Sequence, residues 1–376
     1  MTILSRGLQL LLLAGRTVPR PVSYDVMSAF VSAEVSDSTA QANVFTLTFT
    51  LGRSPLFDYP LLRDAVFAPL NRVIIAVVFN ALTEVLIDGV VTEQQVASGS
   101  RPGEARLVVT GEDLSRMLDR RERSRTFRNQ SDADIVNQLL GDPEYATLGL
   151  QPQVTPTRIR PNETQRVPSQ QGTDLATITA LATRNEFVFY VEPTPVIGQS
   201  VAYWGPPPRR SGTAQPALTV DMGAETNVES SINFQFNALG PVEHEVGRQE
   251  PDSRERLRTP PLFAARTPLA RTPAAALRQT IDRQAAKLDS DRAGQVAATT
   301  AGRAADAITA TGEVDAGRYG RALRARRLVG VRGVGDTFGG LYYVSDVRHH
   351  ISVGNYRMSF TLAREGVGST VALVTV

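Results

Sequence analysis

The sequence is poor in the residues on which much enzyme chemistry depends. Its 376 residues include no cysteine, three histidines and one tryptophan. Without cysteine, the chain can form no disulfide, no thiolate metal site and no cysteine nucleophile. Three histidines leave few ways to pair a nucleophile with an imidazole base. This composition is typical of a protein made in a reducing cytoplasm, and it favours a role other than catalysis.

The chain also lacks a large charge excess and a long hydrophobic run. Forty basic residues face thirty-eight acidic ones, which gives a formal net charge of +2. No basic footprint is concentrated enough to predict recognition of a nucleic acid. The apolar run from Leu8 to Gly15 is too short to span a bilayer, and it lacks a convincing signal-peptide cleavage site. We predict a buried strand or short helix there, and no membrane-spanning segment.

The first third of the chain has strand patterns. From Phe45 to Leu51, apolar residues alternate with threonines, which is the period of a half-buried strand. The continuous apolar run from Arg72 to Phe79 predicts a strand covered on both faces. Further strands are expected from Glu84 to Val91 and from Arg106 to Thr110. We therefore predict an antiparallel barrel or sandwich from about Val18 onward.

The middle of the chain mixes helices with strands. Thr110 to Asp113 and Ser131 to Asp134 each place a hydroxyl three residues before an acid, the pattern of a helix N-terminus. A third helix is expected from about Thr173 to Arg184, because its leucines and isoleucine are spaced for burial on one face. An alternating strand from Glu186 to Glu192 follows it at once. These elements predict a small α+β domain inserted after the first β domain.

The remaining sequence changes character twice. A strand is expected from Ser231 to Ala238, and a proline- and arginine-rich arm follows over residues 248–275. Alanine dominates from Ala274 to about Ala310, a composition that predicts a helix. Strands resume at Arg327 and end in an amphipathic hairpin from Leu341 to Arg364, with its turn at Gly354-Asn355.

These patterns predict a mainly β fold with two antiparallel barrels, an α+β insertion and an Ala-rich helical insertion. The expected segments are an N-terminal stretch (1–17), a first barrel (18–112), an α+β domain (113–200), a second barrel split between 201–240 and 320–376, and the arm with its Ala-rich helix (241–319).

Two motifs resemble a cofactor site or a metal site but lack the arrangement that such a ligand requires. In the glycine-rich stretch from Gly333 to Gly340, Phe338 takes the place of the third glycine of a dinucleotide loop, and a strand follows instead of a helix. The adjacent residues His349 and His350 point to opposite faces of a strand, so they cannot bind one metal ion together. We predict that one packs in the core while the other faces solvent or a neighbour. No cofactor and no metal site are predicted.

Acidic pairs give the weakest case for an enzyme. Glu112-Asp113 and Asp132/Asp134 lie at expected helix starts, where capping and the helix dipole account for them. A carboxylate pair that meets only in the fold stays an alternative, because no motif scan detects such a pair. No catalytic residue is therefore predicted.

Three stretches resemble the phage late control protein D family, which includes the baseplate hubs of contractile tails and of type VI and extracellular injection spikes. The first runs from Thr110 through the helix that ends near Leu140, and the second runs from Leu175 to Val191. The third and most specific follows the C-terminal glycines and the final hairpin, and its matching residues are Gly335, Phe338, Gly340, Tyr342, His349, Gly354, Tyr356, Phe360 and Arg364.

This resemblance implies a structural protein. Members of the family look like two similar barrels with an inserted α+β domain, assembled as a homotrimer whose pseudo-sixfold ring joins a hexameric inner tube to a trimeric spike. Some members continue into a fused spike, so a separate spike protein is expected to be a partner here, beside the tube and other baseplate proteins. Such a chain would be assembled in the cytoplasm and become part of a phage virion or an injection particle. Two alternatives remain: a wall-degrading hydrolase within the α+β insert, and a monomeric β-rich adhesin.

Overall fold

The computed structural model describes residues 2–5, 7–52, 59–99, 101, 103–160, 167–209, 214–249, 256–259, 268–282 and 306–371. The chain divides into two compact units. The first contains residues 1–207, 320–323 and 347–358, and the second contains residues 208–319, 324–346 and 359–376. Each unit is thus built from separate stretches of the sequence.

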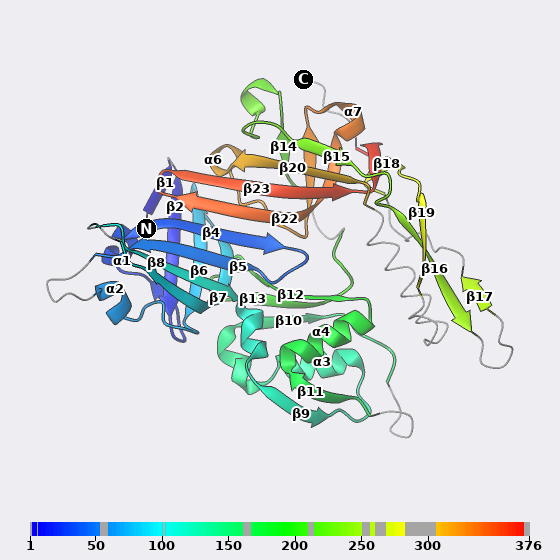
Figure 1. The fold of residues 1–376 in the computed structure, drawn as a ribbon, viewed down its shortest axis with the longest axis horizontal. Coiled ribbons are helices and arrows are strands. Elements are labelled where there is room, and N and C mark those ends of the chain that lie inside the picture. Colours follow the sequence, from blue (N-terminus) through cyan, green and yellow to red (C-terminus); the bar gives the residue numbers. More distant parts are fainter. Residues whose placement is uncertain are drawn as a thin grey trace. The chain divides into compact units, whose positions relative to one another are not determined.

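The first unit is built on an antiparallel sheet formed by the N-terminal third of the chain. Its strands are β1 (Thr2–Ser5), β2 (Leu8–Gly15), β3 (Arg20–Pro21), β4 (Phe30–Ser38), β5 (Val44–Thr50), β6 (Arg72–Phe79), β7 (Leu82–Ala97) and β8 (Arg106–Asp113), with short helices α1 (Tyr24–Ser28) and α2 (Pro60–Arg63). The strands lie in the order β1-β2-β6-β7-β8-β5-β4, and β3 pairs with β2. These are the blue to cyan strands in Figure 1.

Apolar periodicity accounts for the burial of these strands. Phe45, Leu47 and Phe49 of β5 are fully buried, and the threonines between them are half-buried, as alternation predicts. In β6 the residues from Val73 to Val77 are all inaccessible to solvent, as expected for a strand covered on both faces. The run from Leu8 to Gly15 is strand β2 and pairs with β6 along its whole length, so the predicted buried N-terminal strand is confirmed.

The inserted domain follows β8. Its elements are η1 (Leu114–Asp119), β9 (Glu122–Thr126), α3 (Asp132–Leu140), η2 (Pro143–Leu148), β10 (Leu150–Val154), β11 (Ser169–Thr173), α4 (Asp174–Arg184), β12 (Val188–Pro193) and β13 (Ser200–Gly205). Helices α3 and α4 pack against each other and against the sheet β10-β13-β12 (Figure 1). Trp204 lies fully buried in their common core, and its indole N–H donates to the Ile178 carbonyl.

One of the two predicted N-terminal caps is confirmed and the other is wrong. Ser131 and Asp134 form a reciprocal capping box at the start of α3. Thr110 caps nothing, because β8 continues through it to Asp113. The Asp113 carboxylate accepts from the Ser115 N–H and begins the 3₁₀ helix η1 instead. Sheet pairing with β5 and β7 therefore decided the conformation at Thr110.

The second unit combines strands from distant parts of the sequence. Its elements are β14 (Gln215–Thr219), η3 (Gly223–Glu225), β15 (Asn233–Phe236), β16 (Val242–Gln249), β17 (Arg256–Thr259), β18 (Ala270–Pro273), β19 (Arg278–Asp282), β20 (Ile308–Asp315), α6 (Ala316–Tyr319), β21 (Leu328–Arg332), α7 (Gly335–Phe338) and β24 (Gly366–Ser369), with parts of β22 (Gly340–Ser352) and β23 (Asn355–Arg364). Strand β14 is parallel to β21, β21 is antiparallel to β22, and β15 is antiparallel to β20. Strands β17-β16-β19 form a separate sheet (Figure 1).

The final hairpin forms nearly as predicted. Strands β22 and β23 flank a turn at Val353-Gly354, one residue before the predicted turn. Tyr356, Met358 and Phe360 are buried on one face of β23 together with Leu362. The tip of the hairpin, Val347 to Met358, belongs to the first unit.

The predicted Ala-rich helix is wrong at both of its described ends. Arg278–Asp282 is strand β19, which runs parallel to β16, and Ile308 begins strand β20. Helix propensity is a weak preference, and pairing with an existing strand overrides it. Residues 283–305 of the predicted helix lie outside the described residues.

The fold class is mainly β, as predicted, with a large antiparallel sheet, few helices and an inserted α+β domain. Across the described ranges, no helix is both long and apolar enough to cross a membrane.

Candidate functional site

The predicted C-terminal motif centres on a buried cation, Arg364, at the end of β23. Its side chain is inaccessible to solvent and donates to three backbone carbonyls: Gly366 (2.8 Å), Gly339 (2.8 Å) and Thr337 (2.9 Å). The guanidinium carbon lies 4.3 Å from the centre of the Tyr342 ring. We call these five residues the Arg364 cluster. Arginine suits this position because its planar fork can satisfy several acceptors at once while its face stacks on an aromatic ring.

Burial changes the acid–base properties of the cluster. It lowers the pKa of Arg364 and raises the pKa of Tyr342 to about 12, so Tyr342 stays a neutral phenol at physiological pH. The Tyr342 hydroxyl donates to the Phe338 carbonyl at 2.8 Å. Arg364 and Tyr342 together fix the loop that contains α7, so their role in the fold is to hold the glycine-rich stretch in place.

Aromatic stacking extends this cluster to another strand. Phe338 stacks on Phe234 of β15, with the ring centres 4.8 Å apart. The ring centres of Phe234 and Tyr342 lie 6.1 Å apart. Phe360 lies against Gly312 of β20, where a Cβ atom would come within 2.7 Å of the ring. The sequence predicted Phe338 and Tyr342 as motif residues but gave no sign of Phe234 as their partner, because these contacts join residues about a hundred positions apart.

Two glycines of the stretch are required by geometry. Gly333 has φ +80°, and a Cβ there would overlap the Val220 carbonyl oxygen at 1.6 Å. Gly340 has φ +112°, and a Cβ there would crowd Ser369. Gly333 therefore lies at a turn and Gly340 at a close backbone approach, and both positions require glycine.

The other motif residues lie in the first unit. His349 is fully buried and its Nδ1 lies 2.9 Å from the Tyr356 hydroxyl, while Tyr356 also contacts Phe79. The His350 side chain is 43% exposed, so the predicted division between a core histidine and a surface histidine is confirmed. Gly354 has φ +80° in the hairpin turn. The structure thus brings Phe338, Gly340, Tyr342 and Arg364 together, with Gly335 in the same loop, but it separates them from His349, Gly354 and Tyr356 by unit.

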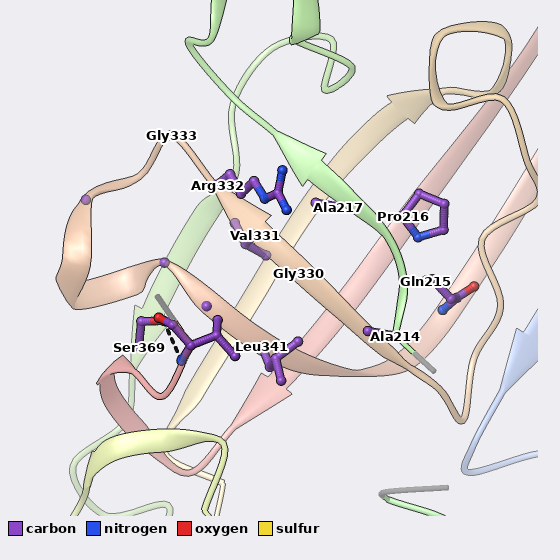
Figure 2. A pocket seen from close by; sticks show the side chains of 14 residues that line it. Ala214, Gln215, Pro216, Ala217, Gly330, Val331, Arg332, Gly333, Leu341 and Ser369 are labelled. Carbon is purple, nitrogen blue, oxygen red and sulfur yellow. Dashed lines mark hydrogen bonds between the residues drawn. The ribbon is translucent and has the colours of Figure 1, made fainter. Parts of the chain in front are cut away.

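A groove of about 590 Å³ adjoins the glycine-rich loop within the second unit. Residues of β14 form one wall, and Ser369 lies on the opposite side (Figure 2). Most of the lining residues are small, so backbone is accessible along the groove; they include Ala214, Ala217, Gly330, Gly333, Gly339 and Gly340. Arg332 is its one charged lining residue among those described.

The acidic residues of the inserted domain are engaged by arginines. Asp142 accepts from Arg123 at 2.7 Å and from Arg125 at 3.0 Å. The Glu144 backbone N–H and these two arginines lower the pKa of Asp142 to about 2. The buried Asp174 accepts from the Tyr145 hydroxyl at 2.7 Å and from Gln170 at 2.6 Å. These carboxylates are already paired, which is how acids that stabilise a fold are arranged.

Comparison with known proteins gives one family model and a set of solved structures. The model of the Alg8 N-terminal domain matches residues 10–196, which cover most of the first sheet and the inserted domain as far as the loop after β12. No curated protein matches the sequence.

The similar solved structures are phage tail and type VI secretion proteins. A tail protein from Neisseria meningitidis MC58 has a TM-score of 0.61 at 12% identity, over 96% of this chain and 98% of its own. The 43 kDa tail protein of prophage MuSo2 from Shewanella oneidensis has a TM-score of 0.62 at 12% identity, over 95% of this chain and 98% of its own. The E. coli c3393 protein, a component of the type VI secretion system, has a TM-score of 0.53 at 13% identity, over 92% of this chain and 77% of its own. The chain therefore shares the β-rich fold of these tail proteins over nearly its whole length.

Proposed function

We propose that the chain is a structural baseplate hub of a contractile tail or injection particle. Three copies would form a pseudo-sixfold ring that joins a hexameric inner tube to a trimeric spike. The observation that carries this proposal is the fold similarity to two tail proteins, one of them from a prophage, each matched over 98% of its own length. A fold alone does not define a function, so the assembly itself is what must be tested.

The pairing of Asp142 argues against a general acid at this position. A general acid needs a pKa near the working pH, and the pKa of Asp142 lies at about 2. Its neighbours Arg123 and Arg125 keep it ionised and paired. We propose no catalytic residue for this chain.

The expected partners are further copies of the chain, the inner tube protein, a separate spike protein and other baseplate proteins. Assembly would take place in the cytoplasm, and the finished ring would be part of a virion or injection particle. Interfaces in permanent rings bury roughly 2,000 Å² or more, so the complex should survive dilution.

The test is co-expression with candidate tube and spike proteins from the same genome, followed by mass photometry and cryo-electron microscopy. The expected result is a particle with three copies of the chain, a hexameric ring on one side and a trimer on the other. A chain that stays monomeric in the presence of both partners, or a ring of another order, would contradict the hub. A monomer that binds glycans would support the adhesin instead.

A further inference from the structure

A buried ion pair lies in the first unit. Arg72 at the start of β6 and Asp88 of β7 are diagonal neighbours, because Arg72 pairs with Val90 and Ile74 pairs with Asp88. Their side chains are 6% and 0% exposed. The Arg72 Nε and Nη2 atoms each lie 2.7 Å from one Asp88 oxygen, which is a two-pronged pair.

The same guanidinium reaches out of the sheet to the inserted domain. Its Nη2 atom lies 2.8 Å from the Leu148 carbonyl and 3.0 Å from the Gly198 carbonyl. The Leu148 carbonyl ends η2, and Gly198 lies in the loop between β12 and β13. One side chain of the sheet therefore binds two separate loops of the inserted domain.

Local backbone geometry brings those two carbonyls together. Gly149 has φ +67° and Gly198 has φ +81°, both in the left-handed region that favours glycine. A Cβ on Gly149 would lie 2.3 Å from the Gly198 carbonyl oxygen, so the two loops touch backbone to backbone. The Ser200 N–H donates to the Gly149 carbonyl at 3.1 Å, which ties the loops to each other. The inserted domain thus presents a preformed acceptor site to the arginine.

We propose that Arg72, held by Asp88, is the positioning residue that fixes the inserted α+β domain on the first sheet. The inserted domain has a hydrophobic core of its own around Trp204, and Val90 of β7 is the buried sheet residue that joins it. Its internal packing does not depend on the ion pair. The pair instead sets where the domain sits, and this inference does not depend on the hub function or on oligomeric state.

The physical reason is the cost of an unsatisfied carbonyl. With the guanidinium gone, the buried Leu148 oxygen would be left without that donor, and the partly buried Gly198 oxygen would lose the same donor; a buried carbonyl without a donor is unfavourable. Moving the domain so that water reaches the carbonyls relieves this cost. Replacing both charged partners by apolar side chains avoids leaving a lone buried charge, and such replacements are often tolerated by the fold. The double variant R72M/D88L therefore separates positioning from folding.

The test measures the distance between the domain and the sheet directly. The chain has no cysteine, so Q95C on β7 and N137C on α3, both at exposed positions, would carry the only two spin labels. Pulsed electron paramagnetic resonance should give a narrow distance distribution for the otherwise unchanged chain. In R72M/D88L the distribution should broaden or shift, while circular dichroism and the fluorescence of Trp204 stay as in the parent.

A matched control removes an arginine whose partners lie within the inserted domain. Arg123 contacts Asp142, Glu144 and Asp174, so R123Q should lower the stability of the domain without broadening the distance distribution. If R72M/D88L does not fold, R72K replaces it, because lysine keeps the charge but cannot form the fork that also reaches both carbonyls. A distribution in the folded variant that matches that of the parent in both mean distance and width would overturn the proposal.

Discussion

At the scale of single residues, buried arginines stabilise parts of this chain's fold, as hydrophobic contacts do elsewhere in it. Arg364 donates to the Thr337 and Gly339 carbonyls of the glycine-rich loop and to the Gly366 carbonyl at the start of β24. Arg72 satisfies two carbonyls of the inserted domain. In both places an arginine replaces secondary-structure hydrogen bonds where the backbone is irregular, because buried carbonyls need donors.

We predict that Arg364→Lys lowers the free energy of unfolding by about 2–4 kcal/mol. A single ammonium group cannot reach Gly339, Thr337 and Gly366 together, so at least one buried carbonyl loses its donor. Urea unfolding followed by circular dichroism measures the change. Arg271→Lys is the control, because Arg271 is 60% exposed and pairs with Asp336 of the same loop. Equal effects of the two substitutions would show that burial of Arg364 is not what matters.

A pair of glycines separates backbone strain from steric overlap. Gly333 and Gly335 have nearly equal φ angles, +80° and +76°, but only Gly333 has a neighbour, the Val220 carbonyl oxygen, where a Cβ would lie. We predict that Gly335→Ala costs about 1–2 kcal/mol, the cost of the left-handed conformation alone. Gly333→Ala should cost clearly more, because its Cβ would force Val220 to move. Thermal unfolding of both variants tests this, and equal melting temperatures would contradict it.

More could be predicted from the sequence about single residues than about elements or about the whole molecule. Alternation along a strand predicted that one of His349 and His350 packs in the core and the other faces outward, and the structure places His349 in the core; the glycine spacing excluded a dinucleotide loop. The roles of Arg72 and Asp88 could not be predicted, although a charged residue within each apolar strand was visible. Their pairing depends on the register between β6 and β7, which no single-strand pattern contains.

At the scale of elements, ion pairs hold the strand β9 against η2 in the inserted domain. Arg123 and Arg125 of β9 both contact Asp142, which also accepts from the Glu144 N–H and so caps η2. The side chain of Asp142 is 19% exposed. A carboxylate with these three donors stabilises the fold only while it is ionised.

We predict that this contribution disappears at low pH. The folded pKa of Asp142 is about 2, below its ordinary value of 3.8. A lowered carboxyl pKa stabilises the fold fully above the ordinary value, and this stabilisation is lost as the pH falls from about 4 to about 2. Asp142→Asn should therefore be destabilising at pH 6 and nearly neutral at pH 2. Urea unfolding of both proteins over this range is the measurement.

Asn137→Ala, on the exposed side of α3, is the control for that series, because its effect involves no ionisable group. The difference in the free energy of unfolding between this variant and the parent should stay constant with pH. A difference between parent and Asp142→Asn that also stays constant would show that the charge of Asp142 contributes nothing.

Helices and strands could be predicted from the sequence where the apolar periodicity was strong. The prediction was wrong where pairing with a neighbouring strand determined the conformation. The helices near Ser131 and Thr173 have the predicted positions, since capping and apolar spacing agree there. The sequence predicts a helix start at Thr110 and a helix in the alanine-rich segment. Thr110 instead lies in β8 and part of the alanine-rich segment is β19, and both strands pair with neighbouring strands. Local propensity is worth only tenths of a kcal/mol per residue, and a strand partner outweighs it.

At the scale of the whole molecule, the order of elements in the sequence differs from their grouping in space. The sequence predicted a second β set split by an insertion. It gave no sign that residues 347–358 belong with the N-terminal sheet, because such grouping depends on contacts between residues hundreds of positions apart. Phe79 and Tyr356 contact each other with ring centres 6.0 Å apart, and Arg321 pairs with Glu84.

This grouping predicts that the N-terminal half cannot complete its fold alone. A fragment of residues 1–207 lacks the hairpin tip that belongs to the first unit, so it should expose apolar surface such as Phe79 and lose cooperative unfolding. A fragment of residues 113–205 is the matched control, because its hydrophobic core is almost entirely its own. Trp204 is the only tryptophan, so its fluorescence follows the inserted domain in both fragments. The longer fragment should show an early, broad change in circular dichroism and a later fluorescence transition that matches that of the shorter fragment. Coincident, cooperative transitions in residues 1–207 at the melting temperature of the full chain would contradict the prediction, since the sheet would then need no strand from the C-terminal hairpin.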